Sequence, residues 1–166
     1  AIVGSPVRGD NGLWSAEIEL LLADDVVSPE AGFCATVHAL QQLIASLIEP
    51  GSKADRLVLT GLVLSPQCKP VANALLDFWH CDEAGDYDNQ GFRYRGHVLA
   101  DARGRYRLET IVPGEYPGRT RHIHVNVRPP GARVLTTQLY FPNEPGNRSD
   151  GIYRPELTMQ LAPTGG

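Results

Sequence analysis

Two histidines separated by a single residue, His122 and His124, are the first candidates for chemistry in this sequence. The residues around them predict a β-strand, and side chains two apart on a strand project from the same face. Both imidazoles can therefore reach one metal ion, whereas Ile123 points to the opposite face. Taken alone, such a pair is more often a pair of polar residues on a solvated strand, so a metal site needs further donors.

Two loop tyrosines are candidates for those donors. Tyr87 and Tyr116 each stand two residues after a glycine, Gly85 and Gly114 respectively. Loops beside a rigid sheet are where functional residues concentrate. A phenolate is a hard anionic donor that has lost its proton, which favours a strongly Lewis-acidic ion such as Fe(III) over Zn(II). Each tyrosine on its own is more simply explained as a half-buried aromatic anchored by its hydroxyl.

Other histidines and tyrosines are predicted to be structural or exposed, because they lie within predicted strands, at strand ends or on a predicted helix. These residues are Tyr106, Tyr140, His38, His80 and His97. The position of Tyr94 is left open.

Several common activities lack their motifs. The sequence has no Gly-x-Ser-x-Gly elbow, no Cys-x-x-Cys pair and no glycine-rich phosphate loop. The net charge of −4 is spread over interspersed acidic and basic residues, which argues against nucleic acid as a partner. No run approaches the ~20 apolar residues that span a bilayer, so no membrane association is expected.

Length and composition predict one globular domain over residues 1–166. Three cysteines are too few for a disulfide scaffold. Cys68 and Cys81 flank a predicted strand and are too far apart to bridge. A bond from Cys34 to either one stays open, and so does the cellular compartment.

Short strands separated by turn residues dominate from residue 56 onward and predict a mainly β fold, an antiparallel β-sandwich over residues 56–162. The expected strands are Leu57–Leu64, Ala74–His80, Phe92–Ala100, Arg105–Thr110, Arg121–Arg128, Leu135–Phe141 and a last one near Leu157–Leu161. Residues 1–55 are expected to be helical or irregular. Within them, Ser28-Pro29-Glu30 signals a helix start, and apolar spacing predicts a helix near Ala35–Ile48. The apolar residues around Ile18–Leu22 fit either helix or strand.

Four segments resemble the intradiol ring-cleavage dioxygenase family, which includes the catechol, protocatechuate and hydroxyquinol dioxygenases. The segments are Asp77–Tyr87, Gly104–Pro117, Arg119–His124 and Thr136–Phe141. They occur in the family's order. The resemblance implies a β-sandwich that holds one non-haem Fe(III), with Tyr87, Tyr116, His122 and His124 as metal ligands.

The resemblance also implies a reaction. A catechol would lose both protons and chelate Fe(III), displacing Tyr116, whose phenolate then serves as a base. With O2, the ring would open between its two hydroxyl-bearing carbons to a muconate-type diacid. Arg119 would stabilise negative charge on the substrate, and Gln138 would line the same site. Small-molecule catechol and O2 are thus the expected partners, and a homo-oligomer is compatible with the sequence.

Two segments depart from the family pattern. Residues 31–46 differ from the usual continuation after Ser28-Pro29-Glu30, and Thr120-Arg121 stands where other members carry Pro-Ala. The second feature resembles the compact, short-chain branch of the family, and the first bears on substrate access and pocket shape. An alternative function is a non-catalytic β-sandwich binding module that has kept the scaffold. A third possibility is a zinc or copper site of the cupin type, which requires a further His and a Glu and leaves both tyrosines unexplained. The sequence does not specify which catechol is the substrate.

Overall fold

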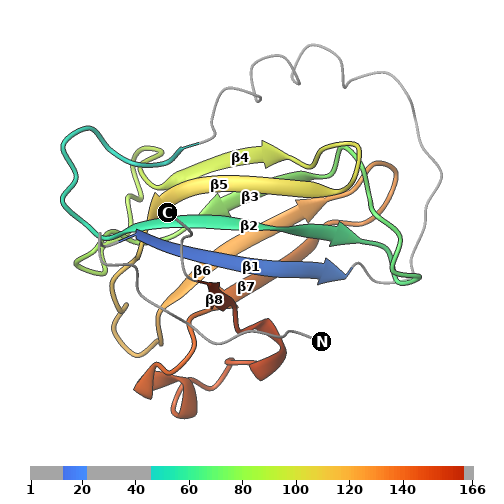
Figure 1. Cartoon of the computed structure of the whole chain (residues 1–166). Helices are drawn as coiled ribbons and strands as arrows, with labels where there is room; N and C mark the ends of the chain where they lie inside the picture. The colour runs from blue at the N-terminus through green and yellow to red at the C-terminus, as the bar shows by residue number, and fades with distance from the viewer. Residues whose placement is uncertain (1–12, 22–45, 163–166) are drawn as a thin grey trace.

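The computed structural model describes residues 13–21 and 46–162, which form two four-stranded sheets packed face to face (Figure 1). The strand orders are β5-β2-β1-β8 and β4-β3-β6-β7. The strands are β1 (Leu13–Leu21), β2 (Arg56–Leu64), β3 (Leu75–Trp79), β4 (Arg95–Leu99), β5 (Arg105–Ile111), β6 (His122–Arg128), β7 (Leu135–Tyr140) and β8 (Gln160–Ala162). The predicted mainly β sandwich is confirmed.

The first strand comes from the N-terminal part of the chain and runs parallel to its neighbour. β1 pairs with β2 in parallel register from Leu13 opposite Arg56 to Leu21 opposite Leu64, while the remaining strand pairs are antiparallel. Parallel neighbours need a long connection, which residues 22–55 supply. The open choice at Ile18–Leu21 is therefore resolved in favour of a strand. The expectation of helical or irregular chain is wrong for residues 13–21, which join the sandwich predicted over 56–162 because they pair with the edge of β2.

The predicted helix near Ala35–Ile48 lies mostly outside the described residues, as does His38. Its last three residues, 46–48, are described, and they are not helical. Ser46 forms a bridge with Glu109, and the Leu47 N–H donates to the Glu109 carbonyl at 2.8 Å. The expected helix end at Ile48 is wrong, because this segment pairs with the outer edge of β5 and buries the Leu47 side chain.

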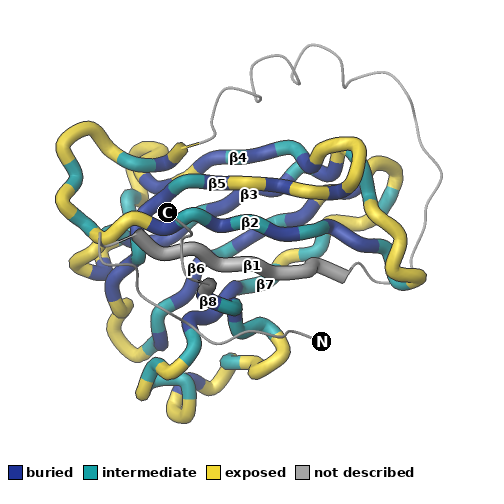
Figure 2. Tube along the Cα trace, viewed as in Figure 1, coloured by how far each residue is buried: buried dark blue, intermediate teal, exposed yellow. Residues whose placement is uncertain are grey.

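The core lies between the sheets and follows the two-residue period of the strands (Figure 2). On β2, Leu57 and Leu59 are fully buried, and on β6 the same holds for Ile123, Val125 and Val127. Each such side chain contributes about 1.5–3 kcal/mol relative to exposure to water. This burial sets the register of β6 and so places His124, between Ile123 and Val125, on the outer face of its sheet.

Two strands differ in length from the prediction. β4 begins at Arg95 rather than Phe92, because the Asp88 carboxylate accepts N–H groups from Gln90, Gly91 and Arg93 and so closes a turn before the strand. Near the C-terminus, Pro155–Leu157 is a 3₁₀ helix (η2), and β8 starts only at Gln160. The loop between β7 and β8 also contains a 3₁₀ helix, η1 (Pro145–Arg148), and projects from one end of the sandwich (Figure 1).

Cys68 is exposed, Cys81 is buried, and both are free thiols. Cys34 lies outside the described residues. Residues 13–21 and 46–162 contain no helix long and apolar enough to cross a membrane.

Candidate metal centre

Three of the predicted donors converge at the start of β6, on the outer face of its sheet. The Tyr87 hydroxyl lies 3.1 Å from His124 Nε2 and 3.3 Å from His122 Nε2. The two imidazole Nε2 atoms are themselves 3.1 Å apart. Nitrogen and oxygen ligands bonded to one ion at about 2.0–2.1 Å are about 3 Å from each other. The spacing of these three atoms therefore suits a shared metal ion.

The fourth predicted donor, Tyr116, lies beside this cluster rather than within it. Its ring meets the Tyr87 ring edge-on, with centroids 5.5 Å apart, and the residue is 44% exposed. Tyr116 lines the same cavity of about 450 Å³ as Tyr87, His122 and His124. It is therefore within reach of the site but is the least constrained of the four side chains.

Within the described residues, tyrosine is the side chain available to join the two histidines in a metal site. Among the residues that the structure describes, no group of three or more His, Cys, Asp or Glu side chains lies close enough to hold a metal ion. The cupin-type zinc or copper alternative requires such a group, so it does not fit the described part of the chain. Two imidazoles with a phenolate instead favour a hard, strongly Lewis-acidic ion.

The protonation states of the three converging side chains follow from their burial. Desolvation, followed by the neighbouring His122, lowers the pKa of His124 to about 4, and desolvation also lowers the pKa of His122. Both imidazoles are therefore neutral at pH 7, which is the form that binds metals. Desolvation raises the pKa of Tyr87 to about 12, so its phenol keeps its proton until a cation replaces it.

Neighbouring groups orient both imidazoles. His122 Nδ1 donates to the Thr120 carbonyl at 2.7 Å, which leaves the lone pair on Nε2 directed at the donor cluster. The His124 ring stacks on Trp79, with centroids 4.8 Å apart and planes 2° from parallel. This stacking follows from strand register, since Trp79 on β3 lies directly opposite His124 on β6.

Arg119 and Gln138, the two further residues that the resemblance named, are hydrogen-bonded to each other. Arg119 lines the cavity, and its Nη2 donates to Gln138 Oε1 at 2.6 Å. The register of β7 places Gln138 opposite His124. The Tyr140 hydroxyl donates to the same Gln138 oxygen at 2.7 Å, so Tyr140 joins the polar network although its ring is buried.

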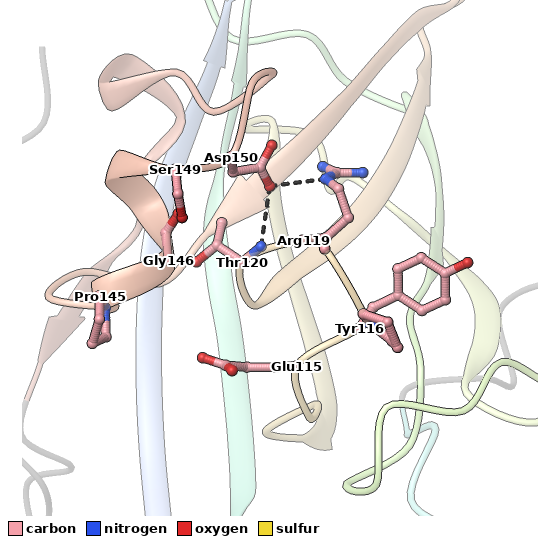
Figure 3. Close-up of a pocket in the computed structure, with 10 residues that line it drawn as sticks. Glu115, Tyr116, Arg119, Thr120, Pro145, Gly146, Ser149 and Asp150 are labelled. Carbon is pink, nitrogen blue, oxygen red and sulfur yellow. Dashed lines mark hydrogen bonds and ion pairs between the residues drawn. The ribbon is translucent and has the colours of Figure 1, made fainter.

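Sequence reasoning missed three residues that support the site: Trp79, Thr120 and Asp150. Asp150 Oδ2 accepts from Arg119 Nε at 2.8 Å and from the Thr120 N–H at 3.1 Å (Figure 3). Burial would raise the pKa of Asp150, but the hydrogen bonds from Arg119 and from backbone N–H groups outweigh it and lower the pKa. Asp150 could not be found from the sequence, because no periodicity distinguishes a single Asp in a polar loop. Trp79 could have been found by pairing its strand with β6.

Several rings predicted to be structural or exposed make structural contacts, and the Tyr140 ring packs beside His122 with centroids 6.2 Å apart. His80 is buried against Thr110, and His97 contacts the Asp77 carboxylate at 3.3 Å. Tyr106 is buried in the core, where it packs near Phe78. Tyr94, whose position the sequence left open, is also buried, and its ring stacks on His80.

Comparison with known proteins finds that this chain is similar to dioxygenases. A family model described as "Dioxygenase" matches residues 28–161. The protocatechuate 3,4-dioxygenase beta chain of Burkholderia cepacia is 37% identical over 119 residues, which cover 60% of this chain and 50% of that protein. The chlorocatechol 1,2-dioxygenase of Pseudomonas sp. (strain P51) is 32% identical over 136 residues, covering 66% of this chain and 54% of that protein. This chain thus spans about half the length of the curated relatives it matches.

Solved structures agree with this comparison. One is the dioxygenase domain of a dioxygenase carbohydrate-binding protein fusion from Streptomyces sp. SirexAA-E. It is 43% identical, with a TM-score of 0.71 over 86% of this chain and 91% of that one. Another, the 3-chlorocatechol 1,2-dioxygenase of Rhodococcus opacus 1CP, is 27% identical, with a TM-score of 0.67 over 86% of this chain and 68% of that one. From the sandwich fold, the matched family model and these relatives, the chain belongs to the intradiol ring-cleavage dioxygenase family.

Proposed function

We propose that this chain is a non-haem Fe(III) intradiol dioxygenase. It opens a catechol-type ring with O2 between the two hydroxyl-bearing carbons, giving a muconate-type diacid, as in the catabolism of aromatic compounds. The observation that supports this most directly is the convergence of Tyr87, His122 and His124 within 3.1–3.3 Å of one another. Relatives named as catechol and chlorocatechol 1,2-dioxygenases support the substrate class.

The donor set fits Fe(III), and each residue has a role in holding it. His122 and His124 would bind as neutral imidazoles, and Tyr87 would bind after losing its proton. Tyr116, the exposed member, would be the ligand that an incoming catechol displaces. Bound Fe(III) would supply the Lewis acidity that activates a chelated catecholate toward O2.

The remaining side chains would handle protons and charge. If a catechol displaced it from the metal, the Tyr116 phenolate would stay in the cavity and could accept a proton from a catechol hydroxyl. Arg119 lines the same cavity and would stabilise negative charge that develops on the substrate, because its position is already set before the reaction. Gln138 holds one guanidinium nitrogen of Arg119 at 2.6 Å.

The colour of the iron-loaded protein tests the proposal. Tyrosinate bound to Fe(III) absorbs visible light, so protein reconstituted with Fe(III) should be coloured and should take up O2 when a catechol is added. Tyr87→Phe should abolish or strongly shift the absorption band, and Tyr116→Phe should shift it. Tyr106→Phe is the matched control, since Tyr106 is buried in the core, and it should keep the wild-type band.

A protein that stays colourless after reconstitution would overturn the proposal. If the protein is coloured but takes up no O2 with any catechol, the alternative of a non-catalytic module that has kept the scaffold replaces it. A panel of unsubstituted, halogenated and carboxylated catechols would then define the substrate.

A further inference from the structure

A buried aspartate outside the donor cluster is bonded to the cationic side chain of the site. Asp150 lies in the loop after η1, and its side chain is only 1% exposed. Figure 3 shows its carboxylate between the Arg119 side chain and the Thr120 backbone nitrogen. Its second oxygen, Oδ1, accepts the Ile152 N–H at 3.0 Å.

We propose that Asp150 is a positioning residue, which holds the Arg119 guanidinium at the cavity of the candidate metal centre in the geometry that ring cleavage requires. This inference rests on the proposed dioxygenase function. Within the described part of the chain, the hydrogen bonds of the Asp150 carboxylate go to Arg119, Thr120 and Ile152 and not to Tyr87, His122 or His124, so Asp150 acts through Arg119.

The geometry fixes the guanidinium from two elements. Arg119 Nε donates to Asp150 Oδ2 at 2.8 Å, and Nη2 donates to Gln138 Oε1 at 2.6 Å. A guanidinium has five N–H groups in a planar fork, so these two bonds set its plane and leave other N–H groups for a ligand. A long arginine side chain loses rotamer entropy when it is ordered, and these two bonds order the Arg119 side chain before a ligand binds.

The same carboxylate oxygen also holds the backbone next to Arg119. Asp150 Oδ2 accepts the Thr120 N–H at 3.1 Å, so one atom restrains both the Arg119 side chain and the peptide that follows it. Gly118, just before Arg119, has a φ of +79°, a left-handed conformation that favours glycine. The Asp150 carboxylate therefore fixes the peptide that follows this turn from outside the loop.

Only a carboxylate satisfies all three N–H donors around this position. Two of them converge on Oδ2 and the third binds Oδ1. An asparagine has one oxygen, so its NH2 group would face an N–H donor on one side. Asp150→Asn therefore keeps the shape of the side chain and breaks part of the arrangement.

Kinetics of the iron-loaded protein provide the first test. Activity per bound iron should fall about 10–100-fold in Asp150→Ala, mainly in kcat, because Arg119 acts on charge that develops during the reaction. In an Arg119→Ala background, adding Asp150→Ala should cost less than about threefold, since the effect runs through Arg119. Asp150→Asn, which keeps the side-chain volume, should show the same coupling if the alanine variant fails to fold.

A readout on the metal-free protein tests the contact without activity. In a ¹H–¹⁵N spectrum, the Arg119 Nε–H signal, assigned by its loss in Arg119→Lys, should be protected from exchange with water. This protection should be lost in Asp150→Ala. The matched control is Asp101→Ala, because Asp101 Oδ2 also accepts an arginine Nε, that of Arg105, at 2.8 Å, but in a distant turn. This control should leave the Arg119 signal and the activity per iron at wild-type values.

The outcomes separate the inference from the proposed function. An active wild type whose Asp150→Ala variant keeps its kcat per bound iron and loses only thermal stability would overturn the inference alone. The inference would also be overturned if the double variant lost activity per bound iron by the product of the two single losses from Asp150→Ala and Arg119→Ala. A wild type with no iron-dependent O2 uptake would overturn the proposed function, and this inference with it.

Discussion

Two histidines in this molecule, His80 and His124, have the same low pKa. They differ in the groups that face their Nε2 atoms. Desolvation lowers the pKa of both His80 and His124 to about 4. His80 Nδ1 lies 2.7 Å from the Cys81 carbonyl and Nε2 lies 2.6 Å from the Thr110 hydroxyl. Because a carbonyl only accepts, Nδ1 carries the proton and Nε2 accepts from Thr110. Both nitrogens of His80 are thereby satisfied.

The candidate metal centre is arranged differently. His124 Nε2 faces the Tyr87 hydroxyl at 3.1 Å and the Nε2 of His122 at 3.1 Å. These three side chains can all donate electron pairs to a cation, so a metal ion can take the place of the proton that they share. A lowered pKa thus reports burial in both regions, and the chemistry of the facing atoms separates a structural histidine from a candidate ligand.

Removing a histidine from each region should separate the two roles most strongly. His122→Ala or His124→Ala should weaken iron binding more than about 100-fold, because altering even the partners of metal ligands costs 10–100-fold. His80→Gln should lower thermal stability and leave the absorption per bound iron unchanged. Iron titration by visible absorption and thermal unfolding measure the two effects. Normal iron binding by both alanine variants would contradict the assignment of the site.

Lowering the pH should reduce the free energy of unfolding, because His80 is buried in its neutral form. Its pKa is about 4 in the folded protein and near 6.5 when exposed, so between these values the unfolded chain binds more protons. The free energy of unfolding should therefore be fully retained above pH 6.5 and fall by up to about 3 kcal/mol as the pH drops to 4. Urea unfolding of metal-free protein at several pH values measures this loss.

The comparison with His80→Gln isolates the contribution of this histidine. His122 and His124 have pKa values lowered in the same direction, so they also contribute to the wild-type slope. The variant should lose less stability than the wild type over the same pH interval. Identical slopes would show that His80 is accessible to protons in the folded protein.

A smaller effect is expected from the hydroxyl partner of His80. Thr110→Val keeps the shape of a fully buried side chain and removes the donor to His80 Nε2. Leaving a buried nitrogen without its partner should cost about 1–2 kcal/mol of unfolding free energy at pH 7. Iron binding and colour should not change. An altered absorption band would mean that the two histidine regions are coupled.

Parts of this protein follow from local patterns in the sequence. The two-residue period of the strands places His122 and His124 on one face, and burial of Ile123 and Val125 confirms the register. Turn residues and apolar alternation located seven of the eight described strands to within about three residues, and β1 was the strand that they missed. The motif resemblance named Tyr87, Tyr116, Arg119 and Gln138. In the structure the first three line a single cavity, and Gln138 is hydrogen-bonded to Arg119.

Tertiary structure decided what depends on long-range pairing and loop conformation. The Tyr87 hydroxyl reaches His122 only because the β3–β4 connection folds back over β6, and Trp79 stacks on His124 because β3 pairs with β6 in one register. Asp150 meets Arg119 across 31 residues through an irregular loop that has no period to predict. The sequence alone determined the donor types and the spacing of the two histidines, since strand geometry is local. The position of Tyr116 beside the cluster, and the burial that keeps the imidazoles neutral, arise only when the sheets and loops pack.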